Sequence, residues 1–191
     1  MADNLSSLSK PELIDLVEDL QKTNGVLERK VIWLKTLTRN STGQNAELYI
    51  LELLNGIPSI RNDGHDMIVR GGKLLEVKGS DCSHFKVNKG DYHRWTWHNF
   101  LGSGGNKTYH RLILVGEPDK KYIETYKDKK APFVIFDVPF EWANDFANNK
   151  KTKKFSFHLQ SKKGGAKGIH LRKMWEFEVT REELISRYKL G

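Results

Sequence analysis

The feature that most constrains this chain is a pair of short apolar segments on either side of two glycines at residues 71–72. Strand-length segments joined by a glycine turn are typical of a β-hairpin. Because side chains alternate between the two faces of a strand, Leu75 and Val77 point one way, while Glu76 and Lys78 share the other face about 7 Å apart. The second strand therefore projects a carboxylate and an ammonium together from a half-buried surface.

Asp66, near the start of the first strand, joins that face only in one type of register. A two-residue glycine turn would place Asp66 opposite Val77, and its side chain would point away from Glu76. A three-residue turn over residues 71–73 would instead place Asp66 opposite Lys78, on the face that carries Glu76. We therefore predict a three-residue turn or a bulge in which a glycine adopts a positive φ.

An acid-x-lysine triplet is not informative by itself, because the chain contains others at residues 28–30, 119–121 and 128–130. Those three have polar or helical surroundings. Only Glu76-Val77-Lys78 lies in an apolar strand pattern with an aspartate at the far end of the preceding strand. The alternative interpretation is a surface hairpin whose charges are simply solvated.

Asp66 together with Glu76-Val77-Lys78 resembles the motif of the PD-(D/E)XK nuclease superfamily, which includes many restriction endonucleases, junction resolvases and some homing endonucleases. The resemblance covers roughly residues 45–140. The residue before Asp66 is His65, where the motif has a proline. Many members also carry a glutamate on an upstream helix, and Glu47 matches that position.

The resemblance implies a role for each of these residues. Asp66, Glu76 and the backbone carbonyl of Val77 would hold Mg²⁺, which prefers hard oxygen ligands. Lys78 would hold or help deprotonate the attacking water, and proximity to the metal should lower its pKa. Glu47 would bind a second metal or orient water, and it is favoured over Glu52 because it lies nearer the start of the helix.

Strand and helix patterns alternate along the rest of the chain, which predicts an α/β (α+β) fold with a mixed central sheet flanked by helices, like the restriction-endonuclease core. We expect an N-terminal helix and linker over residues 1–43 and a nuclease domain over residues 44–191. Within that domain, helices are expected over 44–55, 140–147 and 180–189, and strands, besides the hairpin, over 84–87, 111–115 and 132–138.

The N-terminal helix should begin with a capping box at Ser9 and Glu12. It carries a heptad repeat, with leucine at one position and mainly valine at the other: Leu13, Leu20, Leu27 and Leu34, then Val17, Asn24 and Val31. A polar residue at one such position pairs best with its symmetry mate in a parallel two-stranded coiled coil. The helix therefore predicts a homodimer, or alternatively an apolar stripe that packs on its own domain.

Basic residues exceed acidic ones, 32 to 24, for a formal charge of +8, which favours a polyanionic partner. Residues 150–173 contain lysine, arginine and glycine but no acidic residue, which indicates a DNA-contacting region; a solvated loop is the alternative. The aromatic stretch at 92–100 adds Arg94 as a phosphate contact. The predicted DNA-binding residues are Arg94, Lys153, Lys154, Lys162, Lys163, Lys167, His170, Arg172 and Lys173.

These features together predict a Mg²⁺-dependent endonuclease acting on double-stranded DNA, with a dimeric type II restriction endonuclease as the leading choice. A homing endonuclease, a junction resolvase and a non-catalytic nucleic-acid-binding protein remain open. The chain has a single cysteine, Cys82, and shows neither a signal-peptide core nor an apolar membrane span. These features favour a cytoplasmic protein, encoded by a bacterium or by a phage. Cys82 is expected to be a small semi-buried residue rather than a nucleophile.

Overall fold

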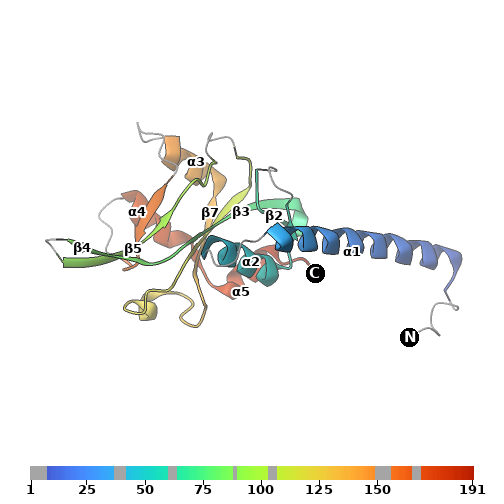
Figure 1. Cartoon of the computed structure of the whole chain (residues 1–191), viewed down its shortest axis with the longest axis horizontal. Helices are drawn as coiled ribbons and strands as arrows, with labels where there is room; N and C mark the ends of the chain where they lie inside the picture. The colour runs from blue at the N-terminus through green and yellow to red at the C-terminus, as the bar shows by residue number, and fades with distance from the viewer. Residues whose placement is uncertain are drawn as a thin grey trace. The chain divides into compact units, whose positions relative to one another are not determined.

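The structure is a computed structural model, and it describes residues 8–36, 42–59, 64–87, 90–102, 107–148, 156–164 and 169–191. Its contacts divide the chain into two compact units, Met1–Leu37 and Thr38–Gly191. The first unit holds the helix α1 (Lys10–Thr36) (Figure 1). At its start, the Glu12 carboxylate accepts hydrogen bonds from the amide and the hydroxyl of Ser9, each at 2.7 Å. In the described part of the chain, no helix is both long and apolar enough to cross a bilayer.

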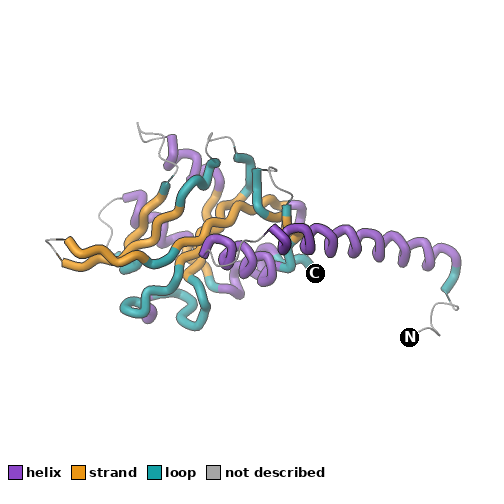
Figure 2. Tube along the Cα trace, viewed as in Figure 1, coloured by secondary structure: helices purple, strands orange, loops and turns teal. Residues whose placement is uncertain are grey.

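The second unit is built on a six-stranded sheet with the order β1-β2-β3-β6-β7-β9 (Figure 2). Its strands are β1 (Ile57–Pro58), β2 (Met67–Val69), β3 (Lys73–Ser80), β6 (Arg111–Gly116), β7 (Val134–Pro139) and β9 (Glu178–Val179). The strands β3 and β6 run parallel, and the other neighbours are antiparallel. The predicted mixed sheet is therefore confirmed.

A smaller antiparallel sheet has the order β4-β5-β8. Its strands are β4 (Ser83–Val87), β5 (Gly90–Trp97) and β8 (Phe157–Gln160). The first two lie in the crossover between β3 and β6, and Figure 1 shows them extending away from the large sheet. Trp95 and Trp97 of β5 are fully buried, and their spacing of two places both on one face of the strand.

Helices cover both faces of the large sheet. The helices α2 (Thr42–Leu54) and α5 (Arg181–Tyr188) lie on one face, where the buried Asp137 of β7 accepts hydrogen bonds from Arg187 and Tyr188 of α5. On the other face, α3 (Phe140–Asn148) packs over an aromatic core that includes Phe136 and Phe146. This core also receives Trp95 from the small sheet, so the two sheets share one interior.

Most of the predicted elements are present, with shifted ends. The helix predicted to begin at Gln44 begins at Thr42, inside the expected linker, and its end is marked by Asn55, whose φ is +50°. At the C-terminal helix the predicted capping box is complete, because Thr180 and Glu183 exchange side-chain and backbone hydrogen bonds.

Two elements in the lysine-rich region were not predicted: the strand β8 and the short helix α4 (Ile169–Met174). In β8 the residues Phe157 and Leu159 are buried and His158 between them is exposed. That alternation is a strand signal, but the many surrounding lysines obscure it in the sequence.

Helix α2 approaches β3 closely at Gly79. A Cβ at residue 79 would lie 2.7 Å from the carbonyl oxygen of Thr42, 2.8 Å from the Cβ of Ala46 and 2.9 Å from the Cα of Gly43. The hydroxyl of Thr42 also donates a hydrogen bond to Asp81, just beyond the end of β3. Any side chain at residue 79 would push α2 off the strand.

We therefore expect Gly79→Ala to lower the free energy of unfolding by about 1–3 kcal/mol, the usual cost of overpacking against a backbone that cannot yield. Gly43→Ala is the matched control, because a Cβ at that position of α2 meets nothing within 4 Å. Urea unfolding of both variants measures the difference. Equal stabilities would show that the contact at residue 79 does not hold the helix in place.

Candidate active site

The hairpin of β2 and β3 turns over three residues, Arg70–Gly72, and pairs Val69 with Lys73. The predicted length of the turn and the positive φ of its glycine, +74° at Gly71, are confirmed. The predicted position, residues 71–73, is wrong by one residue. Both glycines have a positive φ, so the chain has already reversed at Gly72, and Lys73 is extended with φ −71° and ψ 132°.

The shift changes the partner of Asp66. Continuing the pairing of Met67 with Leu75 by one residue brings Asp66 opposite Glu76 and not Lys78. Because residues on opposite strands that face each other lie on the same side of the sheet, Asp66 still shares a face with Glu76 and Lys78.

The three predicted side chains lie together. The ammonium of Lys78 is 2.5 Å from Oε1 of Glu76 and 3.7 Å from Oδ2 of Asp66. It also donates a hydrogen bond to the carbonyl of Val77, at 3.1 Å. Asp66 accepts a hydrogen bond from the amide of Val77 at 2.7 Å, so the backbone of β3 fixes the orientation of its carboxylate.

Glu76 is fully buried, and its two carboxylate oxygens have different surroundings. Its Oε1 is 2.5 Å from the ammonium of Lys107 as well as 2.5 Å from that of Lys78. Its Oε2 is buried with no hydrogen-bond partner among the described residues. A buried carboxylate oxygen without a donor is energetically costly, so this atom is a candidate ligand for a cation.

Glu47 of α2 belongs to the same cluster. Burial, together with the negative charges of Asp66 and Glu76, raises its pKa to about 7. The exposed Glu52 lies elsewhere on the helix. The structure thus brings Glu47, and not Glu52, close enough to the hairpin for the charges of the site to act on it.

The surroundings of the cluster also shift the pKa values of Glu76 and Lys78. Burial and the charge of Asp66 raise the pKa of Glu76. Burial by itself would lower the pKa of Lys78, but the carboxylates of Asp66 and Glu76 outweigh burial and raise it. In the metal-free protein Lys78 is therefore a charged hydrogen-bond donor. The lower pKa expected of Lys78 beside a metal ion stays a prediction.

Two residues of the cluster, Lys107 and Tyr109, were not predicted. Lys107 reaches Glu76 across 31 positions of sequence. Tyr109 is buried, its hydroxyl has no hydrogen-bond partner among the described residues, and burial with the charge of Glu76 raises its pKa. Both precede β6, and the parallel pairing of β6 with β3 brings them to Glu76. The sequence could point to these two residues only if the pairing of β3 with β6 were already known.

The predicted DNA-binding residues are only partly placed. Lys153, Lys154 and Lys167 lie outside the described residues, and His170 lies in α4 without a described side chain. Lys162, Arg172 and Lys173 are exposed. Lys163 donates a hydrogen bond to the buried Glu178 at 2.8 Å, which ties it to β9. The guanidinium of Arg94 lies over the ring of Phe85, 4.2 Å from its centroid.

Cys82 is half-buried, as expected. Burial and the nearby charge of Asp119 raise the pKa of its thiol to about 12. At neutral pH the thiol is therefore protonated, which argues against a role as a nucleophile.

No protein-family model matches this chain, and no curated protein shows significant similarity to it.

The raised pKa of Glu47 makes a testable contribution to stability. Between its ordinary value of 4.5 and about 7, the folded protein holds a proton that the unfolded chain has released. Folding stability therefore falls as the pH rises through this window, and the loss is complete above it. We expect Glu47→Gln to stabilise the metal-free protein at pH 8 by on the order of 1–3 kcal/mol relative to its effect at pH 5.

Urea unfolding at the two pH values measures this difference. Glu52→Gln, at an exposed position of the same helix, is the matched control and should have the same small effect at both. A Glu47→Gln effect that did not change with pH would contradict the assignment of Glu47 to the cluster.

Proposed function

We propose that this protein is a Mg²⁺-dependent endonuclease that hydrolyses phosphodiester bonds of double-stranded DNA, and that it is a type II restriction endonuclease. The observation that carries the proposal is the gathering of three carboxylates, from Asp66, Glu76 and Glu47, around the ammonium of Lys78. Asp66, Glu76 and Lys78 are the residues on which the PD-(D/E)XK resemblance rests, and Glu47 matches the helical glutamate that many members carry. They lie on a mixed sheet flanked by helices.

The residues present fit a divalent cation. Crowded carboxylates raise one another's pKa values, and a cation relieves that repulsion. Asp66, the carbonyl of Val77 and Oε2 of Glu76, which has no hydrogen-bond partner among the described residues, are hard oxygen donors of the kind that Mg²⁺ selects. When bound, Mg²⁺ would make a coordinated water more acidic and offset negative charge on the phosphoryl oxygens.

Three side chains of the protein would supply the other functions that the reaction needs. The ammonium of Lys78 would donate to a phosphate oxygen and stabilise charge as it develops. Lys107 would act as a positioning residue that holds Oε1 of Glu76 and leaves its Oε2 for the cation. Glu47, whose pKa is about 7, would orient water and accept a proton near neutral pH, or bind a second metal.

The charge distribution supports a nucleic-acid substrate. The formal charge is +8, and the exposed Lys162, Arg172 and Lys173 are available for phosphate contacts. Lys153, Lys154, Lys167 and His170 would add to the same contact, with Arg94 from the small sheet.

The helix α1 would join two copies of the chain. Its heptad side chains Leu13, Val17, Leu20, Leu27 and Val31 are 38–53% exposed. A parallel coiled coil would bury this stripe and pair Asn24 with its symmetry mate. A dimer would supply one nuclease site for each DNA strand, which suits a protein that cuts a palindrome.

The first test is incubation of the protein with long duplex DNA and Mg²⁺. Discrete fragments are expected for a restriction endonuclease. A smear would point to a non-specific nuclease, and intact DNA that is nevertheless bound would point to the alternative, a non-catalytic binding protein that uses Asp66 and Glu76 structurally.

The assignment of the site predicts that Asp66→Ala and Lys78→Ala each reduce the cleavage rate by at least about 100-fold while DNA binding persists. Lys130→Ala is the matched control, because it changes the last residue of another acid-x-lysine triplet, at an exposed position. Cleavage assays and gel-shift binding on the same preparations separate the two effects. Full cleavage by both site variants would exclude this site.

The dimer predicts that Leu20→Lys with Leu27→Lys converts the protein to a monomer, because two charges would enter the apolar seam. Asp15→Lys is the control, since it adds the same charge of +2 at a heptad position that faces outward in the coil. Light scattering reports the mass. A double variant that kept the mass of the parent, or a parent protein that was already monomeric, would exclude dimerisation through α1.

A further inference from the structure

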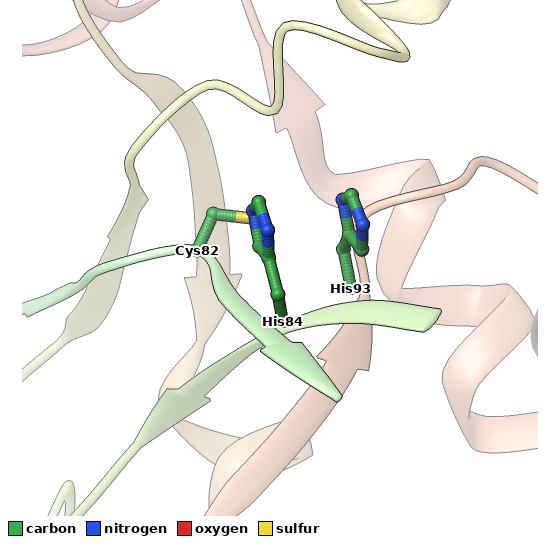
Figure 3. Close-up of side chains that lie close together, drawn as sticks. All are labelled: Cys82, His84 and His93. Carbon is green, nitrogen blue, oxygen red and sulfur yellow. The ribbon is translucent and has the colours of Figure 1, made fainter. Parts of the chain in front are cut away.

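A second group of side chains that could hold a metal ion lies at the small sheet, apart from the carboxylate cluster. Cys82, His84 and His93 each offer a donor atom, and the three donor atoms all lie within 4.8 Å of one another. Figure 3 shows the two imidazole rings side by side with the sulfur of Cys82 beside them. The proposed nuclease function uses none of these residues.

The hairpin of β4 and β5 dictates this arrangement. His84 and His93 are directly paired across the two strands, so their side chains must leave the same face. Their rings stack at 3.8 Å between centroids, with 5° between the planes. Cys82 precedes His84 by two positions, and the alternation of side chains along an extended chain carries it to that face as well.

An acidic residue orients one of the imidazoles. Nδ1 of His93 is 2.7 Å from Oδ2 of Asp119, and because a carboxylate accepts, Nδ1 donates the hydrogen and Nε2 keeps its lone pair. A carboxylate behind a histidine is the usual support of a metal-binding imidazole. Asp119 is itself buried and held by the hydroxyl of Ser161 at 2.6 Å and the amide of Lys121 at 3.0 Å.

The donor set selects the metal. One sulfur and two imidazole nitrogens suit Zn²⁺ and not Mg²⁺, which requires oxygen ligands. Tetrahedral Zn²⁺ places its sulfur and nitrogen ligands roughly 3.3–3.7 Å apart. The donor atoms lie within 4.8 Å of one another, but the two stacked rings are parallel, so one ion cannot lie in the plane of both. Because His84 is exposed, its side chain can rotate out of the stack and turn a ring nitrogen toward the same ion.

We propose that Cys82, His84 and His93 form a zinc site with a water molecule as its fourth ligand. Cys82 would bind as the thiolate, releasing its proton to solvent. The ion would clip the start of β4 to β5 and so stiffen the hairpin that projects from the large sheet. This proposal does not depend on the nuclease function.

Cobalt provides the test, because Co²⁺ replaces Zn²⁺ and absorbs visibly in a tetrahedral thiolate site. The full chain, stripped of metal and kept reduced, is titrated with Co²⁺ in the presence of excess Mg²⁺. We expect a thiolate-to-cobalt charge-transfer band that saturates at one equivalent and disappears on addition of Zn²⁺. The band can come only from Cys82, since the chain has one cysteine.

Variants assign the ligands. Cys82→Ser should abolish the charge-transfer band. His84→Ala and His93→Ala should weaken metal binding by at least about tenfold, and Asp119→Asn by about 10–100-fold. His98→Ala is the matched control, an exposed histidine just beyond the end of β5, and should bind cobalt like the parent protein. Asp66→Ala should also bind normally, which separates this site from the carboxylate cluster.

The parent protein alone is enough to overturn the proposal, because no charge-transfer band at saturating Co²⁺ would mean that Cys82 is not a ligand. A loss of binding in His98→Ala equal to that in His84→Ala would also overturn it. Thermal unfolding gives an independent readout, since Zn²⁺ should raise the melting temperature of the parent and of His98→Ala, but not that of Cys82→Ser.

Discussion

Gly79 lets the helix α2 approach β3 at a distance that no other residue type would permit. That contact fixes the height of the helix above the strand, and with it the position of Glu47 relative to the hairpin. The cluster of carboxylates depends on this approach, because Glu47 comes from the helix while Asp66 and Glu76 come from the sheet. A larger side chain at residue 79 would leave the hairpin of β2 and β3 intact but would move Glu47 away from the site.

The carboxylate cluster lowers the stability of the folded protein, because like charges are held close together away from water. Glu76 is fully buried, and Asp66 and Glu47 bring two more carboxylates close to it. Lys78 and Lys107 offset part of this repulsion, but both act on Oε1 of Glu76, and no described residue donates a hydrogen bond to its Oε2. A purely structural network would be expected to satisfy both oxygens. A buried group of carboxylates whose charge is only partly offset is more typical of a functional site.

Side-chain alternation made the site partly predictable. It placed Glu76 and Lys78 on one face of a strand. Asp66 can lie on the same face only if the turn between the two strands has an odd number of residues, so the parity of the turn was predictable as well. The exact turn was not predictable, because it depends on the φ angles of two adjacent glycines. Lys107 and Tyr109 were missed for a different reason: the pairing of β3 with β6, which delivers them, is non-local. The strand β8 could have been found from the alternation of Phe157, His158 and Leu159.

The parallel pairing of β3 with β6 also orders the events of folding. Antiparallel β2 and β3 are joined by a short turn, so Asp66, Glu76 and Lys78 can meet early through local contacts. The strand β6 docks only after the long crossover that carries β4 and β5 has closed, which is slower. Because Lys107 lies just before β6, the pairing of β6 with β3 also brings the second cation to Glu76.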